Sequence, residues 1–263
     1  MRDLGLAGKV VLITGGGGFL GSAFAQGFAD HGARIAIGDS VREKAEQVAG
    51  GLKCQNGAAI GVGADVTKED QVAKMVGTVT GHCGTIDLLV NAAAVQIYPG
   101  KEITEIESSE WDFVLGIGLK GIYMCSRHIV PVMKKAGRGK IVNIASIAGH
   151  RGLPGGSAYS AAKGGVVNLT RQMAVELGKY HINVNSVSPG FTPNRLTSVN
   201  QYQGKADDGK QTVPTGVNLT TPPLGRTGVA EDYVGPVLFL ASSWADYVTG
   251  VDLPVEGGRM AAR

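Results

Sequence analysis

Short runs of aliphatic residues alternate along the chain with longer stretches whose apolar residues recur at helical spacing. The first run, residues 10–13, leads into apolar positions 20, 23, 24, 27 and 28, which is the pattern of an amphipathic helix. Further runs lie at 34–37, 58–62, 87–90, 140–144, 182–187 and 251–255, and helical stretches at 41–52, 68–83, 111–136, 159–180 and 231–242. Strands separated by helices of this length pair in parallel through right-handed crossovers.

Most of these runs are apolar on both faces, as in a sheet that helices cover on both sides. We therefore predict a doubly wound, Rossmann-like α/β fold with a parallel sheet of about seven strands, in a single domain over residues 1–263. Glycine makes up 41 of the 263 residues, roughly twice its usual frequency, which fits the many tight turns of such a fold.

The composition argues against several classes of protein. No apolar run approaches the roughly 20 residues that a membrane span needs, and from the pattern at the amino end we expect no signal peptide. The 25 basic and 22 acidic residues are scattered, so we expect no nucleic-acid partner. Three widely spaced cysteines, Cys54, Cys83 and Cys125, suggest no disulfide framework and indicate a reducing, cytoplasmic compartment. The dispersed histidines predict no metal site.

The turn between the first strand and the first helix reads Thr14-Gly-Gly-Gly-Gly-Phe-Leu-Gly21. Glycines let a pyrophosphate approach the backbone, and the helix amino end offers N–H groups and a positive dipole. A tight turn without a ligand is the alternative, but a strand before and a helix after are the context that dinucleotide binding requires. The residues of this turn predicted to bind a dinucleotide are Gly15, Gly18, Phe19, Leu20 and Gly21.

Asp39 ends the second expected strand, 18 residues beyond Gly21. A carboxylate there can accept both ribose hydroxyls of an adenosine and would repel a 2′-phosphate. The alternative is an aspartate that caps a helix or lies in a solvated turn. Because Ser40 follows and the glycine turn contains no Lys or Arg, NAD is favoured over NADP, although Arg42 lies close by.

Tyr159 and Lys163 are one helical turn apart, so they share a helix face. A nearby cation stabilises a phenolate and lowers the pKa of a tyrosine, which suits proton transfer to or from an alcohol oxygen. Ser146 follows the strand at 140–144, at the edge where α/β sheets place their ligands. Its hydroxyl can bind the same substrate oxygen, and an ordinary turn serine is the alternative.

In their order and spacing these motifs resemble the short-chain dehydrogenase/reductase family, in its shorter single-domain branch. The resemblance covers essentially the whole chain and includes the glycine turn, Asp87-Leu-Leu-Val-Asn-Ala-Ala94, Ile141-Val-Asn-Ile-Ala-Ser146, Ser188-Pro-Gly190 and Glu256-Gly-Gly258. It implies that Ser146 orients the substrate, that Tyr159 transfers the proton, and that Lys163 tunes Tyr159 and binds the nicotinamide ribose.

The same resemblance implies further cofactor contacts and an assembly. Asp65 and Val66 would hold the adenine, Asn91 and Ala93 would line the ribose, and Pro189 and Thr192 would flank the carboxamide. The family also implies a homotetramer, formed through the helices that contain Trp111 and Tyr159 and through the carboxyl-terminal segment. The expected function is that of an NAD-dependent oxidoreductase that interconverts a small-molecule secondary alcohol and a ketone.

Three positions depart from the family pattern. Phe19 stands where the shorter branch has a third glycine, a spacing like that of the longer branch of sugar epimerases and dehydratases. A chain of 263 residues leaves no room for the substrate domain of that branch, and we expect Phe19 to pack under the turn. Asn91-Ala-Ala-Ala94 replaces the family's NNAG but keeps the asparagine.

Gly118 is the third departure, because the family places a tetrad asparagine there that holds a water beside the lysine. Either the backbone alone holds that water, or proton relay is impaired and turnover is low. We favour retained chemistry, since Ser146, Tyr159 and Lys163 are all present. The alternatives are a nucleotide-sugar epimerase or dehydratase and a catalytically weak NAD-sensing protein.

Substrate contacts are expected from loops that follow strand ends. Gln96 and Arg151 are the main candidates, and His150 and Leu153 lie nearby. The polar, glycine- and proline-containing stretch at about 194–223 interrupts the strand–helix alternation, and we predict a substrate lid there.

Overall fold

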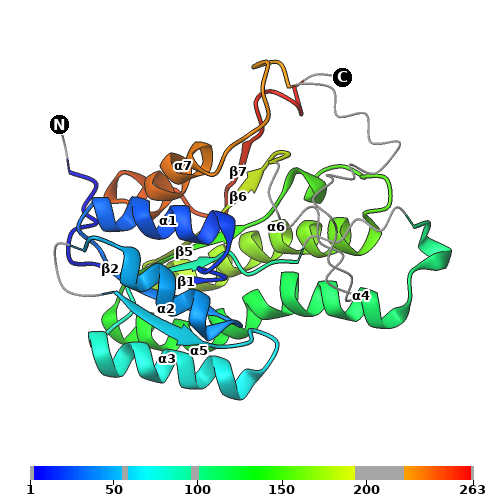
Figure 1. The fold of residues 1–263 in the computed structure, drawn as a ribbon. Helices are drawn as coiled ribbons and strands as arrows, with labels where there is room; N and C mark the ends of the chain where they lie inside the picture. The colour runs from blue at the N-terminus through cyan, green and yellow to red at the C-terminus, as the bar shows by residue number, and fades with distance from the viewer. Residues whose placement is uncertain (1–2, 55–58, 96–100, 193–221, 262–263) are drawn as a thin grey trace.

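The computed structural model of the chain describes residues 3–54, 59–95, 101–192 and 222–261. Within these residues, seven parallel strands form one sheet in the order β3-β2-β1-β4-β5-β6-β7, with helices on both faces (Figure 1). The strands are β1 (Val10–Thr14), β2 (Arg34–Asp39), β3 (Ile60–Gly63), β4 (Leu88–Asn91), β5 (Gly139–Ile144), β6 (Ile182–Pro189) and β7 (Asp252–Val255). The predicted fold is confirmed.

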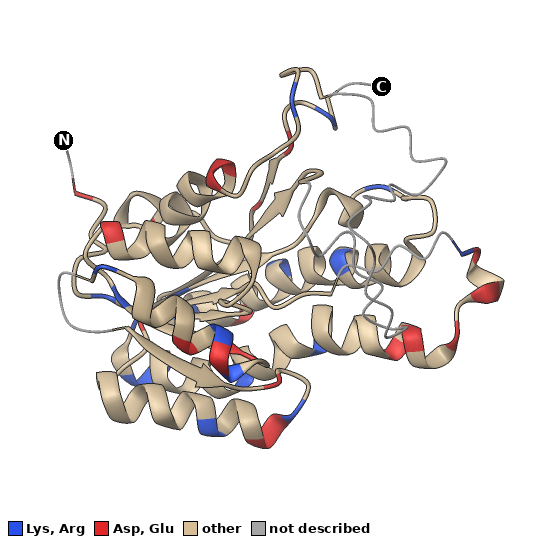
Figure 2. Ribbon diagram, in the orientation of Figure 1, with Lys and Arg blue, Asp and Glu red and all other residues tan. Residues whose placement is uncertain are grey.

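Seven α-helices and several shorter helical turns are described. The helices are α1 (Phe19–Asp30), α2 (Arg42–Gly51), α3 (Glu69–Cys83), α4 (Ser108–Leu115), α5 (Gly121–Ala136), α6 (Ser157–Leu177) and α7 (Glu231–Ala241). The 3₁₀ turns are η1 (Ile103–Glu105), η3 (Ile147–Gly149), η4 (Gly178–Tyr180) and η7 (Ser243–Ala245), and η2 (Gly116–Lys120) is π-helical. Acidic residues concentrate around η1 and the start of α4 (Figure 2).

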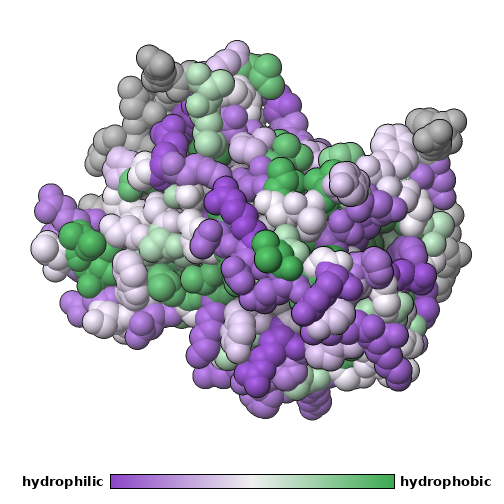
Figure 3. Space-filling model, turned by 180° about the vertical axis from the view of Figure 1, so that it is seen from behind, coloured by the Kyte–Doolittle hydropathy of each residue, from purple (hydrophilic) through white to green (hydrophobic). Residues whose placement is uncertain are grey.

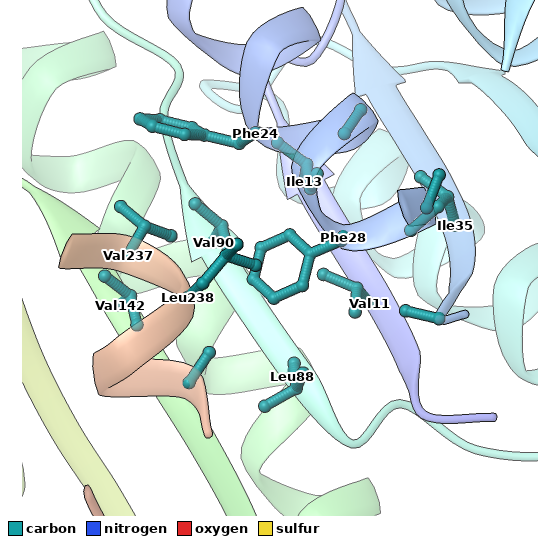
Figure 4. Close-up of a cluster of buried hydrophobic side chains, with 14 of the residues drawn as sticks. Val11, Ile13, Phe24, Phe28, Ile35, Leu88, Val90, Val142, Val237 and Leu238 are labelled. Carbon is teal, nitrogen blue, oxygen red and sulfur yellow. The ribbon is translucent and has the colours of Figure 1, made fainter. Parts of the chain in front are cut away.

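Two apolar cores lie on opposite faces of the sheet, because alternate residues of a strand point to opposite sides. Val11 and Ile13 of β1 enter the core beneath α1, α2 and α7, where Phe24 and Phe28 of α1 are buried (Figure 4). Val10 and Leu12 of β1 enter the second core, beneath α3, α5 and α6. Fully burying one such side chain contributes about 1.5–3 kcal/mol to folding.

Gly27 allows α1 and α7 to pack closely in the first core. A Cβ at Gly27 would lie 2.4 Å from Cγ1 of Val234, so no larger residue fits without movement. The first helix of the chain is therefore covered by the last one.

The expected single helix over 111–136 differs in two ways from the structure. It begins earlier, at Ser108, because Glu107 and Glu110 form a capping box. It is also interrupted by η2, whose glycines Gly116 and Gly118 have low helix propensity. By length and hydropathy the whole stretch Ser108–Ala136 could cross a membrane, but its apolar residues Met124, Ile129 and Met133 are buried in the second core, as in a core helix.

The chain runs outward from β1 to β3 and then returns to β4 beside β1. Ligands of such sheets bind beyond the carboxyl ends of the strands, at the point where the strand order reverses. The glycine turn, Asp39, Asn91, Ser146 and Pro189 all lie at these carboxyl ends.

Candidate active site

The glycine turn after β1 has no room for side chains at two of its positions. Gly15 has φ +63°, and a Cβ there would lie 2.6 Å from Cα of Ala93 at the end of β4. A Cβ at Gly21 would lie 2.3 Å from the carbonyl oxygen of Gly15. The helix α1 starts after Gly18, and no side chain caps its amino end. The first N–H groups of α1 are therefore left for another acceptor, as anion binding requires.

Phe19 does not pack under the turn, so that expectation is wrong. As the first residue of α1 it projects outward and is 40% exposed. It lines a shallow hollow together with Gln47 and Val48 of α2. Leu20, the next residue of α1, packs at the margin of the first core.

Asp39 joins the end of β2 to the glycine turn. Its Oδ2 accepts a hydrogen bond from Gly17 N at 3.1 Å, and its Oδ1 accepts one from Val41 N at 3.0 Å. Val41, not Asp39, is the N-cap residue of α2, so the helix-cap alternative is wrong and the turn interpretation holds in part. Each carboxylate oxygen can accept a second hydrogen bond, which leaves capacity for a ligand hydroxyl.

Asp65 and Val66 follow β3 and have different surroundings. Oδ1 of Asp65 accepts hydrogen bonds from Thr67 N at 2.9 Å and Thr67 Oγ1 at 2.8 Å, so this carboxylate stabilises its own turn. Val66 is buried, and a Cβ at Gly121 would lie 2.7 Å from its Cγ2. The structure therefore places Val66 between β3 and the start of α5.

Asn91 begins a buried chain of polar side chains. Its Nδ2 donates to Asn143 Oδ1 at 2.9 Å, and Asn143 Nδ2 donates to Thr170 Oγ1 at 3.0 Å. Asn143 and Thr170 were not predicted as site residues, although Asn143 lies in the 141–146 motif and is the register partner of Asn91. Oδ1 of Asn91 is buried and accepts no hydrogen bond within the described residues. A hydroxyl donor, such as that of a ribose, fits this orphaned acceptor.

Ser146 lies at the start of the η3 turn, directly after β5. It is the N-cap residue of η3, and its Oγ accepts a hydrogen bond from Ala148 N at 3.1 Å. The side chain keeps its hydroxyl proton for a further acceptor. Ala148 packs with Tyr159 in one small buried cluster, so the structure brings the Ser146 turn against the Tyr159 side of α6.

Tyr159 and Lys163 share the buried face of α6, as predicted. Lys163 Nζ lies 5.7 Å from the centre of the Tyr159 ring and donates a hydrogen bond to the carbonyl oxygen of Ile144 at 2.7 Å. Complete burial lowers the pKa of Lys163 from 10.5 to about 8, because desolvation disfavours the ammonium form. The ammonium is held beside the phenol in a site of low polarity, where its field on the ring is strong.

Gly118 lies in η2, and a Cβ there would be 3.5 Å from Cβ of Ala162, the residue before Lys163. This is an ordinary contact distance, so the site accepts a side chain. A π-helical turn inside a helix is frequent at functional sites. Here it lies against the helix that carries Tyr159 and Lys163.

The structure places the remaining predicted residues in different surroundings. Pro189 ends β6, and the Thr192 hydroxyl hydrogen-bonds the buried hydroxyl of Tyr233. Arg151 is exposed on the loop after η3, whereas the ring of His150 turns away to Asp252 of β7. Gln96 lies outside the described residues, as does the predicted lid at 194–223 apart from its last two prolines.

Comparisons with known proteins identify relatives of the whole chain. A family model described as enoyl-(acyl carrier protein) reductase matches residues 19–259. The cis-4-hydroxycyclohexanecarboxylate dehydrogenase of Sinomonas cyclohexanicum is 36% identical over 97% of this chain and 98% of its own length.

Two solved structures show the same architecture with a cofactor bound. A gluconate 5-dehydrogenase from Burkholderia cenocepacia, in complex with NADP and tartrate, superimposes with a TM-score of 0.88 at 30% identity, covering 99% of this chain and 98% of that one. A 3-ketoacyl-(acyl-carrier-protein) reductase from Brucella melitensis, complexed with NADH, has a TM-score of 0.83 at 34% identity, covering 97% and 99%.

Proposed function

Because the chain belongs to the short-chain dehydrogenase/reductase family of oxidoreductases, we propose that it is an NAD-dependent enzyme that interconverts a secondary alcohol and a ketone. The observation that carries this proposal is the Tyr159–Lys163 pair. A buried ammonium lies 5.7 Å from the centre of a phenol ring, against the turn that carries Ser146.

Tyr159 is the proposed general acid and base. In alcohol oxidation its phenolate oxygen takes the hydroxyl proton of the substrate, and in ketone reduction the phenol returns that proton. The charge of Lys163 stabilises the phenolate form, and Ser146 Oγ donates a hydrogen bond to the substrate oxygen. When bound, the nicotinamide supplies the acceptor or donor of the hydride.

The residues at the carboxyl edge fit a dinucleotide. We assign the pyrophosphate to the uncapped start of α1 at Gly18, the adenosine ribose to Asp39, and the nicotinamide ribose to Asn91 and Lys163. The orphaned Asn91 oxygen and the uncapped helix both lack a partner that a dinucleotide can supply. The remaining proposed cofactor contacts are Gly15, Phe19, Leu20, Gly21, Asp65, Val66, Ala93, Pro189 and Thr192.

NAD is proposed over NADP because of Asp39. Its carboxylate lies at the end of β2 and is fixed by Gly17 N and Val41 N, where a 2′-phosphate would meet a negative charge. Related structures contain either cofactor, so this proposal depends on Asp39 and not on family membership.

A cytoplasmic homotetramer is proposed from the family and from exposed apolar side chains. Phe113 of α4, Tyr123 of α5 and Val175 of α6 are 42%, 47% and 81% exposed. Seen from behind, the surface carries separate apolar areas within polar surroundings (Figure 3). Cys54, Cys83 and Cys125 are all free thiols, as suits a reducing compartment.

The test is a panel of secondary alcohols and ketones with NAD(H) or NADP(H), followed by the absorbance of the reduced cofactor. Tyr159→Phe is expected to lower kcat by about 10³-fold while NADH binding persists, because the proton donor is lost and the ring is kept. Tyr180→Phe is the matched control, since Lys134 Nζ lies 4.0 Å above that partly buried ring. Its kcat should equal that of the wild type.

Three other outcomes would contradict the proposal. Equal rates for Tyr159→Phe and wild type would refute the assignment of the proton carrier. Tight NADH binding without turnover of any alcohol would favour an NAD-sensing protein, the alternative that Gly118 raises. Conversion of a nucleotide sugar without net change in NADH would favour an epimerase.

A further inference from the structure

A buried carboxylate outside the proposed chemistry lies on the edge strand β7. The Asp252 side chain is 4% exposed. Its Oδ1 accepts hydrogen bonds from Ser186 Oγ at 2.5 Å and Ser188 Oγ at 3.0 Å, both on β6. Its Oδ2 pairs with His150 Nε2 at 2.7 Å. Across the described residues, His150 is the one basic side chain that hydrogen-bonds Asp252.

These residues do not form a nucleophilic triad. Ser188 Oγ and Asp252 Oδ2 approach the same ring nitrogen of His150, Nε2, at 3.4 and 2.7 Å. A triad needs one ring nitrogen for the hydroxyl and the other for the carboxylate. Ser188 is also fully buried and donates its proton to Asp252. The arrangement is suited to holding His150 in place.

His150 ends the short turn that carries the Ser146 hydroxyl. Its backbone N–H donates to Ile147 O at 3.0 Å, and Gly149 N donates to Ser146 O at 2.9 Å. Because Ser146 Oγ accepts from Ala148 N within the same turn, the direction of the hydroxyl depends on the position of the whole turn. A shift of His150 would therefore move Ser146.

Besides the packing of Ala148 on Tyr159, contacts with β6 and α6 hold this turn. Ala145 N donates to Val187 O of β6 at 2.8 Å. Gly149 packs on α6, where a Cβ would lie 2.7 Å from the carbonyl oxygen of Lys163. The side chain of His150 attaches the turn to β7 through its hydrogen bond with Asp252, which lies 102 residues further along the chain.

We propose that His150 is a positioning residue, which Asp252 holds so that the η3 turn presents Ser146 Oγ to the substrate oxygen. This inference rests on the proposed dehydrogenase function, in which Ser146 touches the substrate. His150 itself takes no part in proton or hydride transfer.

The test compares His150→Ala, His150→Gln and wild type with the alcohol that the wild type turns over. His150→Ala should lower kcat about tenfold and leave the dissociation constant of NADH unchanged, since a small misplacement of a substrate-orienting group costs turnover. His150→Gln should recover most of the loss, because its amide Nε2 can donate to Asp252. His128→Ala is the control, since His128 pairs with Glu69 at 3.2 Å on the surface.

The assays are run well below the melting temperature of each variant, so that folding does not limit the rate. A His150→Ala enzyme with wild-type kcat would overturn the proposal, as would a His150→Gln enzyme no better than His150→Ala. If His150→Ala does not fold, the kcat values of Asp252→Asn and His150→Gln test the proposal instead. Both variants keep the shape of the contact between residues 150 and 252. Wild type without turnover on any alcohol would overturn the dehydrogenase function together with this inference, whereas turnover that is equal in wild type and variants would overturn the inference alone.

Discussion

The two sides of the candidate site are built from different groups. Beside β1 and β2 the backbone forms the site: Gly15 and Gly21 exclude side chains, and Asp39 accepts from two backbone amides. Beside β4 and β5 buried side chains form it, among them Lys163 and the chain from Asn91 through Asn143. Substitutions on the first side should therefore act mainly on cofactor affinity, and substitutions on the second, which is also assigned the nicotinamide ribose, should act mainly on turnover.

The largest effect is expected for Lys163→Met on the side-chain half. Loss of the ammonium removes the charge that stabilises the Tyr159 phenolate, so kcat should fall by about 10³-fold in steady-state assays at saturating NAD. Lys134→Met is the matched control, because Lys134 lies above Tyr180 at the exposed end of α5 and should have no effect. If Lys163→Met kept more than a tenth of the wild-type kcat, the proposed difference between the two halves of the site would be wrong.

The same variant also reports the cost of burying this charge. The pKa of Lys163 is about 8 in the folded protein and 10.5 in a solvated lysine, so the folded state holds the proton less tightly. Below pH 8 the lysine is charged in both states, and burial costs about 3 kcal/mol. This cost disappears as the pH rises from 8 toward 10.5, so wild type should gain stability relative to Lys163→Met in that window. The free energies of unfolding are measured with urea. A difference between wild type and Lys163→Met that does not change with pH would contradict this prediction.

On the backbone half, Gly21→Ala should weaken NADH binding by roughly 100-fold. The new Cβ would lie 2.3 Å from Gly15 O, so the start of α1 must move away from the pyrophosphate. Fluorescence titration measures the affinity, and kcat at saturating cofactor should change little. Gly77→Ala in α3 is the control, because it has open space around it and should stabilise the helix by about 1 kcal/mol. A larger effect of Gly21→Ala on kcat than on NADH affinity would contradict the proposed difference between the two halves of the site.

A smaller change is expected for Asp39→Ala. Loss of the carboxylate removes the ribose acceptor and the charge that opposes a 2′-phosphate, so kcat/KM for NAD should fall about tenfold and the preference should shift toward NADP. Asp30→Ala removes an exposed carboxylate at the end of α1, which accepts from Gln26, and serves as the control. An unchanged ratio of kcat/KM for NAD to kcat/KM for NADP would show that Asp39 stabilises only the turn.

The smallest effect is expected for Gly118→Asn. The site has ordinary contact distance to Ala162, so the variant should fold. Because Ser146, Tyr159 and Lys163 are in place without the asparagine, kcat should stay within about threefold of wild type. A rise of tenfold or more would show that the glycine impairs proton relay.

Much of the backbone half could be predicted from the sequence. Apolar runs specify buried parallel strands, and the glycine turn lies where a strand passes directly into a helix. The place of this turn in the fold therefore follows from the local sequence pattern. Phe19 shows the limit, since nothing local indicates whether the first side chain of α1 points inward or outward, and it is 40% exposed.

The side-chain half could be predicted only in part. Tyr159 and Lys163 share one helix, so their spacing reveals them. Asn143 meets Thr170 because α6 packs on the sheet, and His150 meets Asp252 because the η3 turn packs beside β7. Local sequence patterns do not contain either arrangement. The π-helical turn around Gly118 was also unpredicted, because glycines lower helix propensity without specifying how the helix deviates.

The close contact between Gly27 and Val234 has a consequence for how the protein is made. Phe24 and Phe28 of α1 share a core with Tyr233, Val237 and Leu238 of α7 (Figure 4). A ribosome releases α1 some two hundred residues before α7. The nascent chain therefore lacks the α7 part of this core for most of its synthesis, which is the period when chaperones and aggregation compete for incompletely covered apolar surfaces.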